Sequence, residues 1–336
     1  MSLSVIFRID PIEPINMKIG IFSVLYNEKP LEDVLKYVSG LGYEAIEIAA
    51  WKGSNHIDLD KVLSGGASEL KKTVEKHGMI ISALSNHLEG QLVLGPQDSS
   101  TDEWFKGTPE QKTKYGIERM KKTAIAAAAL DVPVVNGFIG VPNWGAWYVF
   151  PPAHEKMYES YFNLFAQRWG EILDTFKEQD VKFAHEVHPQ ELAYNIETAE
   201  MALKAVNRRK EFGFNFDPSH FVWQLIDPVA FIKRFGDRIY HVHAKDAELP
   251  KENLPTSGVI STGAWMRPDR GFRFRVVGWG QVEWKRVMTA LLEVGYNYVL
   301  SYEHEDPVMS REDGCEKTIA FLRPLIIKAP LEKVWW

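Results

Sequence analysis

The chain has 336 residues, of which 45% are hydrophobic, and a formal net charge of −6 at pH 7. This length is enough for two ordinary domains or for one large α/β barrel. The acidic balance argues against general binding to nucleic acid, and no apolar run is long enough to span a membrane. The single cysteine, Cys315, cannot form an internal disulfide, so we expect a reducing, cytoplasmic location.

Regular structure is expected to begin at residue 17. The preceding stretch, "MSLSVIFRIDPIEPIN", is too acidic and its apolar part too short for a secretory signal, so residues 1–16 are expected to be a leader outside the fold. From there on, short apolar runs alternate with segments of helical periodicity. The expected strand–helix pairs are 18–24 with 30–42, 43–50 with 67–78, 79–87 with 108–131, 132–140 with 154–178, 181–188 with 195–206, 211–220 with 228–235, 238–246 with 283–294, and 296–306 with 311–325.

Eight strand–helix pairs in one chain of this size predict an α/β fold, a single (β/α)8 TIM barrel over residues 17–327. A long insertion is expected after the seventh strand, at about residues 247–280, and a C-terminal tail at 328–336. A doubly wound sheet would share the same alternation of elements. However, the turn after its first strand should be rich in glycine, and "GIFSVLYNEKP" is not.

Three late strands each place an acidic side chain on the face expected to line the barrel. In "EFGFNFD" the phenylalanines share the face that packs against helices, which leaves Asp217 inside. In "YVLSYEHED", Tyr298 and the other even-numbered residues are expected to face outward, which leaves Glu303 inside. In "KFAHEVH", Glu186 and His188 share the interior face. Interior acids at the carboxyl ends of barrel strands lie where active sites of this fold are found.

The carboxyl ends of the last expected strands thus supply a candidate metal site. Three carboxylates that face one cavity repel each other unless they are protonated or bind a cation. A lone acid at a strand end is more often part of a loop salt bridge, but four candidates on successive strands favour a metal. Together with one imidazole, the carboxylates suit one divalent ion, Mn²⁺ first, with Mg²⁺, Co²⁺ or Zn²⁺ as alternatives. The expected ligands are Glu186, Asp217, His243 and Glu303.

Other polar and aromatic residues near these strand ends are candidates for substrate contact. His188 is either a catalytic-site residue or a hydrogen-bonding residue behind the metal ligands, and Glu47 is expected to be a buried partner of a histidine. The aromatic segments "VPNWGAWYVFPP" and "GAWMRPDRGFRFRVVGWG" suit a polyhydroxylated substrate. Histidines expected to support packing or loops are His185, His241 and His304. The candidate substrate-binding residues are His220, Lys245, Arg275, Trp144, Asn136 and His87.

Five segments resemble the xylose isomerase-like barrel superfamily, whose members are often described as sugar phosphate isomerases and epimerases and include ketose 3-epimerases. They are "HEVHP", "NFDPSH", "HVHAKD", "RFRVVGWGQVEW" and "VLSYEHED", and they occur in the family's order. The resemblance implies that the four residues named above bind the metal. It also implies that Glu186 and Glu303 exchange the substrate proton, and that His220 contacts the substrate or the ligands.

The resemblance implies a divalent-metal-dependent isomerase or epimerase of a sugar or keto-sugar, which abstracts an α-proton through a metal-stabilised enediolate. An alternative is a lyase or deglycosidase that eliminates the aglycone from a 3-keto-glycoside. The spacing of Glu186 and His188 resembles the C-glycoside-cleaving members, and such a protein would need a small partner subunit.

The sequence leaves two further alternative functions. A DNA repair endonuclease would have metal ligands where Phe272 and Phe274 stand, so no nucleic-acid partner is expected. The remaining alternative is a sugar-binding protein without activity. By analogy with related barrels, a homo-oligomer is expected, and no membrane partner.

Overall fold

The computed structural model describes residues 15–145 and 154–329, and its centre is a closed barrel of eight parallel strands. Each strand pairs with the next one along the chain, and the last pairs with the first. The barrel strands are β1 (Lys18–Phe22), β2 (Ala45–Ala49), β3 (Ile80–Ser85), β4 (Val134–Gly137), β5 (Lys182–Glu186), β6 (Phe212–Phe216), β7 (Ile239–Ala244) and β10 (Val299–Tyr302). The predicted TIM barrel is confirmed.

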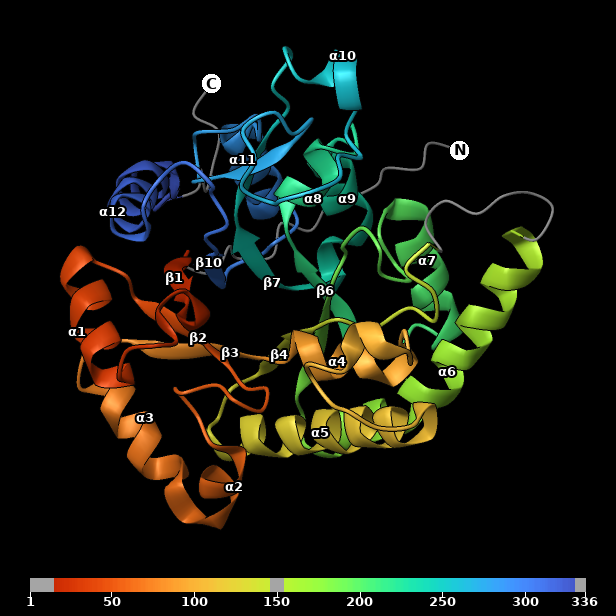
Figure 1. The fold of residues 1–336 in the computed structure, drawn as a ribbon. Coiled ribbons are helices and arrows are strands. Elements are labelled where there is room, and N and C mark those ends of the chain that lie inside the picture. Colours follow the sequence, from red (N-terminus) through yellow and green to blue (C-terminus); the bar gives the residue numbers. More distant parts are fainter. Residues whose placement is uncertain (1–14, 146–153, 330–336) are drawn as a thin grey trace, which may run out of the picture.

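Helices surround the ring of strands (Figure 1). They are α1 (Leu31–Leu41), α2 (Leu59–Lys61), α3 (Ala67–Glu75), α4 (His87–Leu94), α5 (Pro109–Ala129), α6 (His154–Glu178), α7 (Ile196–Ala205), α8 (Pro218–Val222), α9 (Pro228–Phe235), α10 (Leu254–Ser257), α11 (Trp284–Glu293) and α12 (Arg311–Leu322). Single turns of other helix types are η1 (Ser23–Tyr26), η2 (Val62–Gly66), η3 (Ser99–Thr101), η4 (Gly236–Arg238) and η5 (Arg323–Leu325).

The main hydrophobic core lies between the strands and the helices. On β6 the side chains of Phe212, Phe214 and Phe216 are fully buried in it, and the ring of Phe214 lies 5.3 Å from that of Phe231 on α9. The predicted outward face of this strand is therefore confirmed. Because strand residues alternate in direction, the polar residues between these phenylalanines point into the barrel.

The prediction that Tyr298 faces outward is wrong. Its hydroxyl donates to the carbonyl of Ser82 on β3 at 2.8 Å, and its ring lies 6.2 Å from that of His241. Strand β3 is not a neighbour of β10, so the side chain reaches across the barrel. Tyr298 precedes the first residue of β10, where strand alternation no longer fixes its direction. Small residues of other strands, including Ala83 and Ala184, leave room for its ring there.

The expected insertion lies between β7 and α11 and forms a unit of its own. It contains α10 and two antiparallel strands, β8 (Asp246–Glu248) and β9 (Arg273–Arg275). The carboxylate of Asp246 accepts hydrogen bonds from the backbone N–H groups of Gly278 and Val282 and from the indole N–H of Trp284, each at 2.9–3.0 Å. These hydrogen bonds connect the segment that follows β9 to the first residue of β8. A separate hydrophobic cluster forms beneath it from Trp223, Ala247, Leu249, Phe272 and Phe274.

Both expected terminal segments lie mostly outside the described residues. Of the expected leader, the structure describes residues 15 and 16. Ile15 packs against the main core, and the backbone N–H of Asn16 donates to Asn297 at 2.6 Å.

Candidate active site

The four predicted metal ligands meet at the carboxyl end of the barrel. Glu186 is the last residue of β5, Asp217 directly follows β6, and His243 lies near the end of β7, while Glu303 directly follows β10. One potential ligand atom from each residue lies within 4.8 Å of the corresponding atoms of the other three. The first three are buried and Glu303 is partly exposed. The arrangement therefore has the composition and the spacing of a divalent-cation site.

His243 is oriented toward this site by Glu47 of β2. The Nε2 atom of His243 lies 3.1 Å from both carboxylate oxygens of Glu47, and its Nδ1 atom lies 3.2 Å from oxygens of both Glu186 and Glu303. The Glu47 carboxylate therefore accepts the Nε2 proton, which leaves the Nδ1 lone pair for a metal. Asn136 and Ser301 donate to the same carboxylate at 2.9 and 2.7 Å.

These contacts keep Glu47 ionised. Burial alone raises the pKa of its carboxyl group, but His243 and His241 outweigh burial and bring that pKa well below its usual range. The expectation that Glu47 is a buried partner of a histidine matches this geometry. Glu47, His241 and His243 also stand close enough to form a second metal-binding group. Within that group, however, His243 already bonds to Glu47, and His241 to Asn136.

The donor atoms of the main cluster fit a divalent cation. The Oδ2 atom of Asp217 and the Nδ1 atom of His243 are buried and have no hydrogen-bond partner. Burial raises the pKa of Asp217, and the nearby carboxylates of Glu186 and Glu303 raise it further against the effect of Lys245. Their nearest charged neighbours are Lys245, whose Nζ atom lies 3.1 Å from Oδ2 of Asp217, and the carboxylates of Glu186 and Glu303, which lie 3.2 Å from Nδ1 of His243. Three buried or partly buried carboxylates that face one point favour a bound cation there.

Lys245, a predicted substrate contact, stands among the same carboxylates. Its Nζ atom lies 2.6 Å from Glu303, 2.8 Å from Glu305 and 3.1 Å from Asp217. These acids raise its pKa well above the usual range, although burial lowers it. The ammonium group is therefore charged and supplies part of the positive charge that the cluster requires.

Two more predicted substrate contacts hold the carboxylate of Glu186. The Nε2 atom of His87 lies 2.9 Å from one oxygen, and the Nε2 atom of His220 lies 3.0 Å from the other. His220 was expected on a strand over 211–220, and this is wrong. β6 ends at Phe216 because the side chain of Asp217 caps a short helix, α8, by accepting from the N–H of Ser219. The helix brings His220 back over the barrel mouth.

His188 lies beside the cluster with one nitrogen available. Its Nδ1 atom lies 2.5 Å from the carbonyl of Pro189, which fixes Nδ1 as the donor and leaves Nε2 as the basic atom. Burial lowers its pKa, and the ring packs against those of Phe138 and His220 at 5.1 and 4.1 Å. A neutral imidazole with an unpaired lone pair is suited to accept a proton.

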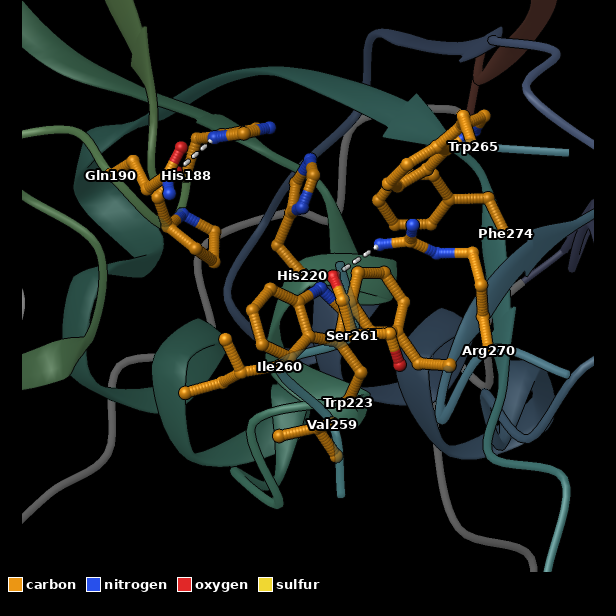
Figure 2. Close-up of a pocket in the computed structure, with 12 residues that line it drawn as sticks. His188, Gln190, His220, Trp223, Val259, Ile260, Ser261, Trp265, Arg270 and Phe274 are labelled. Atoms are coloured by element: carbon orange, nitrogen blue, oxygen red, sulfur yellow. Dashed lines mark hydrogen bonds between the residues drawn. The ribbon is translucent and has the colours of Figure 1, made fainter. Parts of the chain in front are cut away.

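A cavity of about 250 Å³ opens from this point (Figure 2). His188 and His220 form one part of its lining, and the other walls are mainly apolar and aromatic. Most of these walls come from the insertion and from α8: Trp223, Val259, Ile260, Trp265, Phe272 and Phe274. Sequence reasoning identified the aromatic segment of the insertion but did not select Trp265 or Arg270 from it. The clustering of aromatic residues with arginines in that segment was the available signal.

Three predicted substrate contacts have other partners. Arg275 binds Asp306 at 3.0 Å and also pairs with Glu248, so it ties the insertion to the loop after β10. Asn136 bonds to Glu47 and to His241 inside the barrel. Trp144 donates to Ser100 at 2.9 Å and does not line the cavity. Their proposed role in substrate binding stays a prediction, and the remainder of the loop of Trp144, residues 146–153, lies outside the described residues.

The three histidines expected to support packing or loops have contacts of that kind, and His241 is fully buried and bonds to Asn136 and Asn215. His185 is fully buried, and its ring nitrogens lie 3.4 and 3.0 Å from the carbonyls of Gly137 and Ala193. His304 accepts from the backbone N–H of Asp306 at 3.1 Å.

A family model described as xylose isomerase-like TIM barrel matches residues 35–325. The chain belongs to this family. The uncharacterized protein YfiH of Bacillus subtilis (strain 168) is 27% identical over 324 residues, which cover 92% of this chain and 99% of that protein. Among the described residues, no helix combines the length and the apolar character needed to cross a membrane.

Several solved structures share the fold. The IolI protein with a bound zinc atom has a TM-score of 0.63 at 21% identity, over 92% of this chain and 98% of that one. The 3-keto-D-glucoside 4-epimerase YcjR of E. coli has a TM-score of 0.63 at 13% identity, over 92% and 99% of the two chains. Ketose 3-epimerases and a probable dehydratase are also among the structures with this fold.

Proposed function

We propose that the protein is a divalent-metal-dependent isomerase or epimerase that removes a proton next to the carbonyl of a sugar or keto-sugar. The observation that carries the proposal is the convergence of four ligand atoms within 4.8 Å of one another, with His188 beside them in the lining of the cavity. Family members described as acting on keto-sugars, such as YcjR and D-psicose 3-epimerase, support the same class of substrate.

Glu186, Asp217, His243 and Glu303 would hold the metal. A divalent cation bound there supplies a Lewis acid that polarises a carbonyl and makes the neighbouring C–H more acidic. The oxygen-rich donor set favours Mn²⁺, and the zinc described for IolI makes Zn²⁺ the first alternative. A cytoplasmic location belongs to this proposal, since the enzyme would act on soluble metabolites.

The side chains around the cluster would transfer protons and position the metal ligands. The Nε2 atom of His188 takes the carbon-bound proton, since its Nδ1 atom is committed to Pro189. Glu303 is the more exposed of the two candidate acids; it takes a proton from solvent and delivers it to the carbanion, while His188 releases the abstracted proton to solvent. His87 and His220 hold Glu186 in place. Return to the opposite face of the same carbon gives epimerisation, and return to the neighbouring carbon gives isomerisation.

The second candidate function is elimination from a 3-keto-glycoside. The observation that favours it is the aromatic cavity next to His188, which offers a place for an aglycone. The same proton abstraction would then expel a group bound β to the carbanion. This candidate allows for a small partner subunit, and either function is compatible with a homo-oligomer.

Deuterium incorporation from D₂O tests the proposal. The Mn²⁺-loaded protein is incubated with ketoses and 3-keto-glucosides, and mass spectrometry measures deuterium next to the carbonyl. We expect incorporation that falls at least about 100-fold in Glu186→Gln and in His188→Ala, and that is unchanged in the surface control Glu69→Gln. Release of an aglycone would select the lyase. Incorporation that survives in both site variants would contradict the proposal.

A further inference from the structure

Arg270 stands out among the arginines of the insertion because its charge has no counter-ion. Neighbouring Arg267, Arg273 and Arg275 each pair with a carboxylate at normal ion-pair distance. Arg270 is only 7% exposed, yet it forms no ion pair with any described residue. Its Nη2 atom donates to the carbonyl of Ser261 at 3.3 Å, and its Nε atom has no hydrogen-bond acceptor.

Aromatic rings surround this guanidinium group. Its central carbon lies 4.4 Å from the ring centre of Trp265 and 5.8 Å from that of Phe272, and Phe272 in turn stacks on Trp223 at 4.3 Å. Cation–π contacts stabilise the charge, but they do not replace the hydrogen bonds that water or an anion would give. Burial accordingly lowers the pKa of Arg270. A desolvated cation without a partner anion is costly unless a ligand supplies that anion.

Arg270 and the candidate base belong to the same cavity. Figure 2 shows His188 and Gln190 on one side, His220 in the middle, and Arg270 with Trp265 on the other side. None of the residues that line this cavity is an aspartate or a glutamate. The cavity therefore places the candidate base His188, and His220 that bonds to Glu186, next to an apolar space with one uncompensated positive charge.

Phe274 lies between His220, next to the candidate metal centre, and Trp265, next to Arg270. Its ring lies 5.2 Å from that of His220, which bonds to the metal-ligand candidate Glu186, and 5.6 Å from that of Trp265. A ligand with its carbonyl at the metal would therefore pass along Phe274 and Trp265 before it reached Arg270.

We propose that this cavity binds a carboxylate-bearing substituent of the substrate, with the carboxylate on Arg270 and an apolar or aromatic body against Trp265, Phe272 and Phe274. The planar fork of an arginine matches a carboxylate through two parallel hydrogen bonds. A phosphate is less well matched, because no second cationic side chain lines the cavity. The inference rests on the proposed function for the identity of the reacting part, and it adds the class of the group attached to it.

Fluorine NMR of small probes tests this site without turnover. The probes are 4-fluorobenzoate, its neutral counterpart 4-fluorobenzamide, and 4-fluorophenyl phosphate, each titrated against the Mg²⁺-loaded protein. We expect 4-fluorobenzoate to bind at least about tenfold more weakly to Arg270→Gln than to the unmodified protein. Arg270→Lys should lie between the two, because it keeps the charge but not the fork. The control Arg267→Gln, at a partly exposed arginine that pairs with Asp269, should leave binding unchanged.

Three outcomes would overturn the inference. One is equal affinity of 4-fluorobenzoate for the unmodified protein and Arg270→Gln. Another is binding that disappears on chelation of the metal but not in Arg270→Gln, which would place the carboxylate on the metal. The third is tighter, Arg270-dependent binding of the phosphate probe. If Arg270→Gln does not fold, Trp265→Leu should weaken the binding of 4-fluorobenzoate and of 4-fluorobenzamide, and unchanged affinity for both in that variant would contradict the aromatic contact.

The probe titration tests the carboxylate site and the deuterium experiment tests the proposed function, so either can give a negative result without the other. Deuterium incorporation without Arg270-dependent binding of 4-fluorobenzoate would leave the proposed function standing and remove the carboxylate site. Arg270-dependent binding without deuterium incorporation into any tested sugar would support the carboxylate site and count against the proposed function.

Discussion

Replacement of Glu47 by glutamine should weaken metal binding although Glu47 does not itself belong to the proposed ligand set. In the structure both oxygens of Glu47 lie 3.1 Å from Nε2 of His243, whose other nitrogen faces Glu186 and Glu303. Glutamine is nearly the same size, so the packing of the barrel interior is preserved. It removes the negative charge that makes the imidazole a stronger ligand and fixes its proton on Nε2.

The expected loss is 10- to 100-fold in Mn²⁺ affinity, the range typical for a carboxylate behind a ligating histidine, which corresponds to about 1.4 to 2.8 kcal/mol. Isothermal titration of the metal-free protein with Mn²⁺ measures it directly. Glu44→Gln serves as the control, because Glu44 lies one residue before the same strand but points to the surface, where it pairs with Arg323 at 3.6 Å.

An unchanged dissociation constant in Glu47→Gln would refute this reasoning. It would mean that His243 needs no fixed tautomer or does not bind the metal. Thermal unfolding of the metal-free variant should accompany the titration, because a weakened affinity is informative only if the variant is folded to the same extent as the control.

Three further results follow from the structure. His188→Ala should lose at least about 100-fold of deuterium incorporation while it keeps its Mn²⁺ affinity, and a parallel loss of metal would show that His188 acts as a ligand. Asp246→Ala should lower the free energy of unfolding by about 3 kcal/mol or more, since four donors, three of them buried, lose their acceptor, and an unchanged urea midpoint would argue against this. Glu191→Gln should stabilise the protein above pH 8, because burial raises the pKa of Glu191 from 4.5 to about 8. The unfolded chain then ionises first and the free energy of unfolding falls between these pH values, so equal slopes of stability against pH in the variant and the unmodified protein would contradict the assignment.

The fold and the candidate metal site could be predicted because both depend on regular periodicity. Alternation along "EFGFNFD" places Asp217 inside once the phenylalanines are assigned to the core, and the barrel brings the carboxyl ends of all strands together. The same rule places Glu186 and Glu303. The rule needs no knowledge of long-range contacts, since the closure of the sheet supplies them.

The remaining errors lie where periodicity ends. Tyr298 precedes its strand, and His220 follows a helix cap, so neither obeys the alternation of the neighbouring strand. Arg275 and Arg270 belong to the same insertion, yet the first has two carboxylate partners and the second has none. That difference depends on Glu248, on the partner strand β8 of the insertion, and on Asp306, in the loop after β10, and no local pattern in the sequence indicates it.

The central claim is that Glu186, Asp217, His243 and Glu303 form one divalent-metal centre. The most direct test is an anomalous difference map, recorded at the manganese absorption edge, from crystals of the protein grown with Mn²⁺. We expect a single strong peak among these four side chains, on the Nδ1 side of His243. A peak on the opposite side of that imidazole, between Glu47 and His241, or no peak at either position, would contradict it.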